Sequence, residues 1–411
     1  MQSDSNLKTS SVNDTVATPV SVVAPVSIAI LGAAAFVVTA DARVINPLLP
    51  IIATEFKTDV GSTGIIVSAY AIPYGLFQLV YGPLGDRFGK LRIMSVALFL
   101  FSLGTVACTF APTLFLLSLM RFLTGVVAAA IIPMSLAYIG DSFPYKERQV
   151  AIGQFLMASA LAQILSTSLG GVVGDFLNWR LLFFFYGLIS LVIGVVFWRV
   201  ARRAALSSPV HPGRKITFRP YLVLLANPAP RLVIIAVFIE GFFFFGAFSF
   251  LGAFLRDQYN LLYLAIGFIL SIVGLGNLVY SRSVKWLVRR FGENGLILIG
   301  GSLTLVCYLV IGLVQSWLLL IPLNIFLGLG YSMLHSTLQT KATEMAPNNR
   351  GTAVSLFAFS LFLGQGIGTA VLGAVIDGPG YVLAFVIAGV MLALLSIWFV
   401  AASQAYKRST P

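Results

Sequence analysis

Charged residues are scarce in this chain. Only 10% of its 411 residues are charged, whereas soluble domains carry roughly 25%. Hydrophobic residues make up 58%, which is more apolar surface than a soluble fold could bury, so the composition excludes a soluble globular protein. We therefore predict an all-α protein of the lipid bilayer. The length allows about 12 spans of roughly 20 residues each.

Cysteine and histidine are rare as well, with two of each. Cys108 and Cys307 both lie within apolar runs, which indicates buried thiols rather than a disulfide or a metal site. No nucleophile–base pair and no metal-ligand cluster stands out, so we predict no enzyme, no metal and no cofactor. ATP-driven transport by this chain is excluded, because Gly89-Lys90 is followed by Leu91 and lacks the phosphate-binding spacing.

Positive charge is in excess, with a net charge of +12. The basic residues cluster at alternate turns between the apolar runs, and only Lys57, Arg180 and Arg256 fall on the other side. This is the positive-inside pattern of membrane proteins rather than a nucleic-acid surface. It predicts a monomeric multi-pass protein of a bacterial cell membrane, with both termini cytoplasmic and no nucleic-acid partner.

The apolar runs divide the chain into two halves. We predict spans at 24–53, 60–81, 93–112, 113–139, 149–174, 181–200, 231–255, 261–281, 295–314, 316–340, 351–376 and 380–403. The predicted domains are a disordered cytoplasmic tail (1–23), a six-helix bundle (24–200), a cytoplasmic linker (201–230), a second six-helix bundle (231–403) and a short tail (404–411).

An internal repeat supports this division. Arg87-Phe-Gly89 recurs as Arg290-Phe-Gly292, 203 residues later. Further matches at that offset are Arg121 with Asn324, Gly125 with Gly328 and Pro144 with Pro347; at 202 they are Arg148 with Arg350, Gln163 with Gln365, Gly171 with Gly373 and Asp175 with Asp377. A run of matches at nearly constant offset indicates a duplication, with a pseudo-two-fold axis along the membrane normal and a site between the halves.

Several motifs carry a family resemblance. The pattern Gly82-x-Leu-x-Asp-Arg-x-Gly-Lys90 resembles the signature loop between spans 2 and 3 of the major facilitator superfamily. Arg121-x-x-x-Gly125 resembles the fourth-span motif of its proton-coupled drug exporters, and Asp141-x-Phe-Pro-x-x-x-Arg148 resembles its entry to span 5. The likeness covers nearly the whole chain. It implies two pseudo-symmetric six-helix bundles with spans 1, 4, 7 and 10 around a central cavity.

One motif departs from the exporters' pattern. Their fifth-span motif reads Gly-x-x-x-Gly-Pro-x-x-Gly-Gly. This chain has Ala162, Ser166 and Thr167 at the earlier conserved positions and keeps only Gly170-Gly171. The departure keeps functions other than antiport open.

Four charged residues fall well inside predicted spans: Asp41, Arg43, Arg121 and Glu240. Such residues are costly in a bilayer and usually face a partner or a water-filled cavity. Similar depths predict that the first three form one cluster. We predict that Asp41 and Glu240 carry protons, since carboxylates in a cavity of low dielectric constant can load and release protons near neutral pH. The alternative is a fixed ion pair of Asp41 with Arg43 or Arg121 that only holds the spans together.

Other polar side chains are candidates for substrate contacts. Arg43 and Arg121 could tune Asp41 or bind an anionic substrate group. Further candidates around the cavity are Asn324, Gln163, Gln365, Tyr70 and Tyr74, with packing and helix–helix hydrogen bonds as the alternatives. His335 is expected near the cytoplasmic end of span 10, in a structural hydrogen bond.

The signature loop predicts a cytoplasmic gate. The resemblance implies that Asp86 pairs across the cytoplasmic face, with its own loop, with Arg148 or with the start of span 11. The gate residues are Gly82, Asp86, Arg87, Gly89, Lys90, Arg148 and Arg350.

Three functions remain in view. The first is a secondary transporter that exports small organic compounds or drugs in exchange for protons by alternating access. The second is a symporter that imports a small organic anion or sugar with protons, with Arg43 and Arg121 as the anion site. The third is a transport-inactive receptor or scaffold, which would need neither the charged hinge nor the buried carboxylates.

Overall fold

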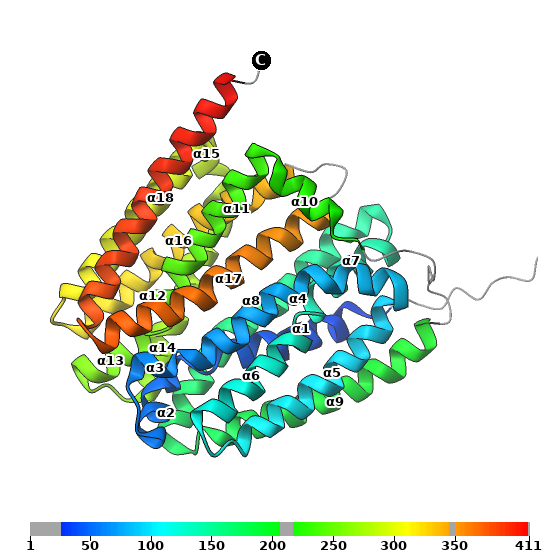
Figure 1. Cartoon of the computed structure of the whole chain (residues 1–411), viewed down its shortest axis with the longest axis horizontal. Coiled ribbons are helices and arrows are strands. Elements are labelled where there is room, and N and C mark those ends of the chain that lie inside the picture. The colour runs from blue at the N-terminus through cyan, green and yellow to red at the C-terminus, as the bar shows by residue number, and fades with distance from the viewer. Residues whose placement is uncertain (1–25, 206–216, 345–349, 410–411) are drawn as a thin grey trace, which may run out of the picture.

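The computed structural model describes residues 26–205, 217–344 and 350–409. Within these ranges all regular structure is helical (Figure 1). The predicted tail 1–23 and part of the predicted linker 201–230 lie outside the described residues, so the domain boundaries stay a prediction.

The number of spans agrees with the sequence. Within the described ranges, 11 helical segments are long and apolar enough to cross a membrane. The longest, Tyr263–Leu313, has 51 residues, about 76 Å at 1.5 Å per residue against a hydrocarbon core of about 30 Å. Gly292 interrupts it with a φ of 65°. This segment therefore holds two spans, and the predicted fold of 12 spans in two six-helix bundles is confirmed.

The first six spans form the N-terminal bundle. In chain order they are α1 (Ile28–Arg43) with η1 (Asn46–Leu48) and α2 (Leu49–Phe56); α3 (Val60–Thr63) with α4 (Ile65–Phe88); α5 (Lys90–Thr109); α6 (Leu114–Ala128) with α7 (Ile131–Ser142); α8 (Tyr145–Phe176); and α9 (Arg180–Ala205).

A short helix, α10 (Arg219–Ala226), precedes the C-terminal bundle. That bundle consists of α11 (Pro228–Glu240) with η2 (Gly241–Phe245), α12 (Gly246–Phe248) and α13 (Leu251–Tyr259); α14 (Tyr263–Ser271) with α15 (Val273–Leu313), which spans the membrane on both sides of Gly292; η3 (Trp317–Leu319) with α16 (Leu320–Glu344); α17 (Arg350–Asp377); and α18 (Tyr381–Ser409).

Backbone geometry repeats between the halves. Gly89 and Gly292 both have positive φ, at 90° and 65°, and they are 203 residues apart. Lys57 and Asn260, also 203 apart, both end their helices in the left-handed region, with φ of 52° and 50°. That region is costly for most residues, so the same unusual turn at matching positions supports the duplication inferred from side chains.

The structure corrects the predicted hinge loop. The sequence pattern placed a loop over residues 82–92, but α4 continues through Phe88 and α5 begins at Lys90. Gly82 therefore lies within a helix, and the turn consists of Gly89 alone. A helix tolerates glycine at a modest cost, whereas the φ of 90° at Gly89 is one that glycine adopts freely.

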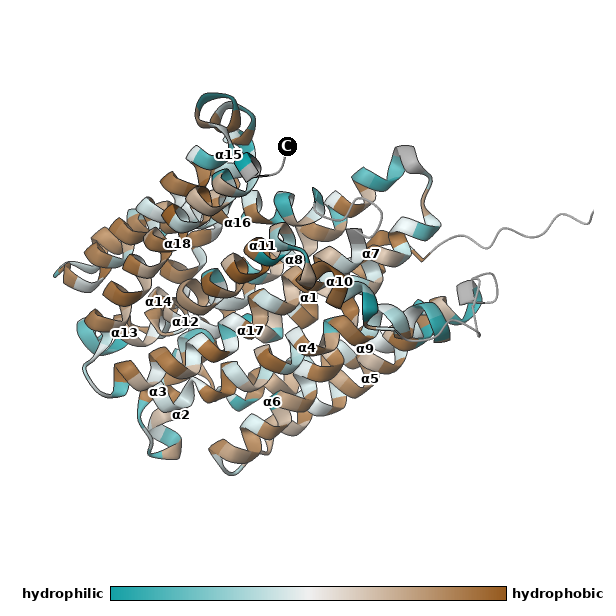
Figure 2. Cartoon of the chain, turned by 45° about the horizontal axis from the view of Figure 1, so that its top comes forward, coloured by the Kyte–Doolittle hydropathy of each residue, from teal (hydrophilic) through white to brown (hydrophobic). Residues whose placement is uncertain are grey.

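The two bundles lie close together at the end that carries α2, α3 and α13, and they diverge toward the opposite end (Figure 1). We call the first end outer and the second, with Gly89 and Gly292, inner, following the sidedness that the basic residues predict. Hydrophobic residues cover the middle of the helices, and polar ones gather toward their ends (Figure 2). Exposed side chains such as Leu103 and Phe115, 68% and 77% exposed, fit a surface that faces lipid.

Candidate functional site

One buried ion pair joins α1 and α6. Arg121 Nη1 lies 2.5 Å from Asp41 Oδ2, and both side chains are 0% exposed. Arg121 Nη2 also donates to the backbone oxygen of Asp41 at 3.3 Å, and the guanidinium lies 4.3 Å from the centre of the Tyr70 ring. Two of the four predicted intramembrane charges thus neutralise each other, as in the ion-pair alternative.

Arg43 does not join this pair. Asp41 and Arg43 are two positions apart on one helix, and residues at that spacing do not face each other. The Arg43 guanidinium lies 4.5 Å from the centre of the Phe245 ring, which belongs to η2 in the other half. Arg43 therefore lies outside the ion pair, and a joint role of the three residues in one cluster stays a prediction.

Glu240, the last residue of α11, has a histidine partner. Its Oε2 lies 3.2 Å from His335 Nδ1 of α16, and the Glu240 side chain is 0% exposed. Its other oxygen, Oε1, is buried and has no hydrogen-bond partner. The predicted end of span 10 at residue 340 placed His335 too close to the cytoplasm. Because α16 continues to Glu344, His335 lies deeper and reaches Glu240.

A π-helix, η2, follows Glu240 directly. Its hydrogen bonds connect residues five apart, and single π-turns inside α-helices occur frequently at functional sites. Tyr331 of α16 packs against this turn, 5.3 Å from the Phe245 ring centre, and stacks on His335 at 4.9 Å. The Tyr331 ring thus lies between His335, which contacts Glu240, and the Phe245 ring, which contacts Arg43.

The remaining predicted polar residues lie in different environments. Tyr70 and Tyr74 are buried and stack at 5.8 Å. Asn324 is buried and donates to Leu320 O of its own helix at 2.8 Å. Gln163 is exposed, whereas Gln365 is only 5% exposed, with its Oε1 lacking a partner. Their roles in substrate binding stay predictions.

A carboxylate of the C-terminal half is hydrogen-bonded to the N-terminal half at the outer end. Asp377, the last residue of α17, accepts from Gly61 N at 2.6 Å and from Ser62 Oγ at 3.0 Å. Gly61 and Ser62 lie in the first turn of span 2, where free backbone N–H groups favour a negative charge.

The repeat mate of Asp377 makes the reciprocal contact. Asp175, at the end of α8, accepts from Tyr263 N at 3.0 Å and from Leu264 N at 2.7 Å, at the start of span 8. We call these two sets of hydrogen bonds the outer clasps. The sequence identified Asp175 and Asp377 as mates but suggested no role for them, because nothing in a linear pattern shows which helix end each one meets.

Glycines bring the halves into backbone contact beside the clasps. A Cβ on Gly171 would collide with Tyr263 O, and a Cβ on Gly373 would collide with Gly61 O. Gly171 and Gly373 are repeat mates, so both clasps depend on a glycine four residues before the aspartate. Any side chain there would push the halves apart.

The predicted gate residues make contacts of another kind at the inner end. Lys90 Nζ lies 3.5 Å from Asp86 Oδ1 and also pairs with Asp141. Arg148 Nη2 donates to Phe143 O at 3.4 Å. These contacts all lie within the N-terminal bundle. Arg87 stacks on Phe88. Arg350 begins α17, and its side chain is not among the described residues' side chains.

The helix α10 adds a contact at the inner end. Tyr221 donates to Leu79 O of α4 at 3.2 Å, and its ring belongs to a small cluster with Ala353 and Leu356 of α17. Burial raises the pKa of Tyr221 above its usual value, which keeps the phenol protonated and able to donate.

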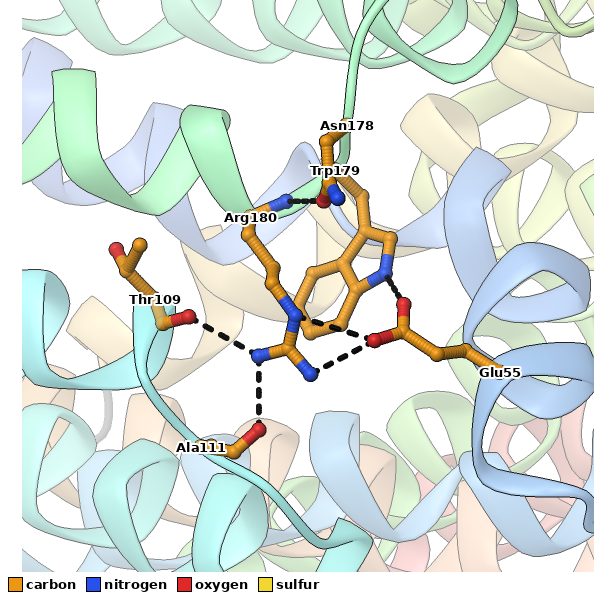
Figure 3. Close-up of polar contacts among 6 residues, drawn as sticks. All are labelled: Glu55, Thr109, Ala111, Asn178, Trp179 and Arg180. Carbon is orange, nitrogen blue, oxygen red and sulfur yellow. Dashed lines mark hydrogen bonds and ion pairs between the residues drawn. The ribbon is translucent and has the colours of Figure 1, made fainter.

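A third polar cluster lies at the outer end of the N-terminal bundle (Figure 3). Arg180 Nη2 lies 2.8 Å from Glu55 Oε1, and the Trp179 indole also donates to Glu55. Arg180 Nη1 donates to Thr109 O and Ala111 O at 3.0 and 2.7 Å. The cluster ties spans 1, 3 and 6 together within one half.

Known proteins resemble this chain along its length. The family model described as "Major Facilitator Superfamily" matches residues 31–316 and 286–411. YceJ of Bacillus subtilis, described as an uncharacterized MFS-type transporter, is 29% identical over 347 residues, which is 82% of this chain and 86% of that protein.

Two further comparisons bear on transport and on the fold. The multidrug export protein EmrB of Haemophilus influenzae is 26% identical over 170 residues, 41% of this chain and 33% of that protein. The inward-facing, unoccupied structure of a bacterial homologue of the human lysosomal transporter Spinster is similar with a TM-score of 0.74, at 18% identity. It covers 93% of this chain and 97% of that one, and it shows the shared fold.

Proposed function

We propose a function from one premise: the chain belongs to the Major Facilitator Superfamily, and it is a transporter rather than an enzyme. On that premise, we propose that it is a secondary active transporter that works by alternating access. It couples the movement of a small organic compound to that of protons. Export in exchange for protons is the first candidate direction.

The two ends of the molecule support alternating access. The outer clasps and the glycine contacts beside them join the halves at the outer end. The charged contacts of Lys90 and Arg148 at the inner end stay within one half. This arrangement corresponds to a state that is closed outside, and rocking of the halves would produce the opposite state.

The observation that carries proton coupling is the contact between Glu240 and His335. A carboxyl group and an imidazole lie 3.2 Å apart within the spans, and Glu240 Oε1 has no hydrogen-bond partner. Asp41, by contrast, is held by Arg121, which does not release protons in proteins. The proposal therefore assigns the transported proton to Glu240 and His335 and a structural part to Asp41.

The direction rests on separate observations. The partial match to EmrB, whose name describes multidrug export, supports export. Import of a small organic anion is the second candidate, because Arg43 has no carboxylate partner among the described residues. A scaffold without transport would leave the titratable pair unexplained.

A proteoliposome assay with an imposed pH gradient tests the proposal. Cationic dyes and organic anions serve as the panel, and substrate exchange without a gradient serves as a second readout. We expect Glu240→Gln to lose pH-driven flux and keep exchange. Glu293→Gln is the matched control, since Glu293 pairs with Lys341 at 2.6 Å outside the site.

Two outcomes would contradict the proposal. Wild-type protein without pH-driven flux of any compound would favour the receptor or scaffold. If pH-driven flux persisted in Glu240→Gln and disappeared in Asp41→Asn, the proton would belong to Asp41 instead.

A further inference from the structure

Arg43 carries a positive charge that nothing in the described chain balances. It lies near the middle of the first span, Ile28–Phe56. Among the described residues it makes no ion pair and no hydrogen bond, and its one described contact is with the face of the Phe245 ring. A charge at this depth is costly unless a partner or water compensates it.

The acidic groups that could have balanced Arg43 are engaged elsewhere. Asp41 is paired with Arg121 at 2.5 Å, and Glu240 lies against His335 at 3.2 Å. The Phe245 ring that contacts Arg43 lies 5.3 Å from the Tyr331 ring, and Tyr70 and Tyr74 are close enough to interact with the Arg43 charge. The surroundings of Arg43 are therefore aromatic, and an opposite charge is missing.

These aromatic rings come from both halves of the molecule. Tyr70 and Tyr74 stand on α4, Phe245 on η2 and Tyr331 on α16. Arg43 itself is on α1 and partly exposed. A ligand bound here would touch both bundles at once, as a transported substrate must in alternating access.

Other arginines that stack on rings show what is different about Arg43. Arg202 lies 4.9 Å from the Trp198 ring centre at the exposed end of α9. Arg256 lies 4.8 Å from the Tyr263 ring and also donates to Leu261 O at 2.7 Å. Both lie toward the ends of their membrane spans, and Arg256 has a backbone acceptor there. Arg43 has the same kind of ring contact at mid-depth, without such an acceptor.

We propose that Arg43 binds the negatively charged group of the transported substrate, and that the substrate is a small organic anion with a planar apolar body. A carboxylate or sulfonate would supply the missing charge, and the guanidinium presents paired donors suited to either group. The surrounding rings would pack against the apolar body. The inference rests on the proposed transport function, and it gives that function a substrate class.

The charges also relate this site to the proton. A bound monoanion cancels the charge of Arg43 and lowers the net charge of the site by one. A proton taken up with the anion by Glu240 or His335 restores that net charge, whereas binding of either ligand alone changes it. The remaining neighbours are the neutral Asp41–Arg121 pair and the three tyrosines. The anion site therefore favours cotransport of substrate and proton, the second direction above.

The experiment compares a matched pair of probes. 1-Naphthalenesulfonate is a permanent anion, and 1-naphthyltrimethylammonium is a permanent cation with the same ring system. Binding to purified protein in a neutral detergent is measured by equilibrium dialysis, with protein-free micelles as background. Proton-driven flux of both probes is then measured in proteoliposomes.

Three variants separate a binding charge from a structural one. We expect Arg43→Gln to weaken binding of the sulfonate at least tenfold, Arg43→Lys to lose only a few-fold, and Arg202→Gln to match wild type. Removing an unbalanced charge should leave the melting temperature of substrate-free Arg43→Gln equal to or above that of wild type. Arg121→Gln, which breaks the buried pair, should lower it.

The outcomes test the anion site separately from the proposed proton-coupled transport. Sulfonate binding that depends on Arg43 without pH-driven flux would support the inference and contradict proton coupling. Flux of the cation alone, or sulfonate binding that is absent or unchanged in Arg43→Gln, would overturn the inference and leave the transporter intact. A fall in the melting temperature of substrate-free Arg43→Gln would also count against it.

Discussion

The outer and inner ends of the molecule use acidic residues in different ways. At the outer end, Asp175 and Asp377 accept hydrogen bonds from the opposite half. At the inner end, Lys90 pairs with Asp86 and Asp141 of its own half. The difference shows two uses of a carboxylate at a helix end. It stabilises the interface between the halves when its partner belongs to the other half, and it stabilises one bundle when its partner belongs to the same half.

The clasps are strong enough to hold a closed end and weak enough to open. Each carboxylate accepts two hydrogen bonds at the start of a helix, where the partial positive charge of the helix end adds to them. Exposure reduces their strength, and Asp377 is the more exposed of the two. We therefore expect about 1 kcal/mol from each clasp, which binding of substrate and proton could offset.

Covalent closure of the outer end should have the largest effect. Ser62→Cys with Asp377→Cys replaces a 3.0 Å hydrogen bond by a disulfide between the halves. In a background without Cys108 and Cys307, we expect oxidation to abolish flux and a reductant to restore it.

A cysteine pair within one half provides the control. Glu55→Cys with Arg180→Cys replaces a contact of the N-terminal cluster at the same end of the molecule (Figure 3). Because Glu55 and Arg180 meet only through the tips of long side chains, this pair is joined with a short thiol-reactive cross-linker, which should leave flux intact. Full flux in the cross-linked Ser62–Asp377 pair would show that the outer end need not open.

Weakening both clasps should have the next largest effect. In Asp175→Asn with Asp377→Asn, each site loses its negative charge at a helix start. At about 1 kcal/mol for each clasp, the equilibrium should shift roughly 30-fold toward the outward-open state. The rate at which a cysteine at the outer interface reacts with a water-soluble maleimide measures this shift.

The single variants sharpen the same comparison. Asp175 is less exposed than Asp377, so Asp175→Asn should shift the equilibrium more than Asp377→Asn. Equal reactivity of wild type and the double variant would mean that the clasps do not decide the state.

At the inner end, Asp86→Asn should have a smaller effect, in the opposite direction. Asp86 has contacts beyond Lys90, but its pair with Lys90 lies within one half, so the loss of that pair changes the closed-outside state little. The variant should favour that state slightly, by about twofold, because the charge implied for closing the inner end is lost. Inner-end cysteine accessibility measures this change, and a fall in accessibility would contradict the assignment.

Glu55→Gln should have the smallest effect on the equilibrium. The cluster of Glu55, Trp179 and Arg180 stays within one half during rocking. We expect a melting temperature lower by roughly 1–3 °C, from the loss of a partly exposed ion pair. Outer-end cysteine reactivity should equal that of wild type, and a change in it would show that the N-terminal bundle does not move as one body.

Patterns that are local in the chain were predictable from the sequence. Apolar run length gave most span boundaries to within a few residues, although the helices of spans 2 and 8 continue well past the predicted ends at 81 and 281. Matched residues at a constant offset indicated two related halves. The positive φ at Gly89 and Gly292 follows from a residue type that the sequence already showed at both turns.

Contacts that depend on where a helix ends were harder to predict. Four additional residues of α16 bring His335 to the depth of Glu240, and apolar run length does not show them. The separation of Arg43 from Asp41 could have been predicted, since two residues two positions apart on a helix face different ways. The partners of Asp175 and Asp377 could not have been predicted, because they belong to the other half.

The central claim is that the two ends open in alternation, and paired distance measurements test it most directly. Spin labels at Lys57 and Asn260 report the outer end, and labels at Phe88 and Phe291 report the inner end; all four side chains are exposed. Pulsed electron paramagnetic resonance would compare wild type with the double Asn variant of the clasps. We predict that the outer distance lengthens while the inner one shortens. Two distances that stay fixed, or that lengthen together, would contradict the account.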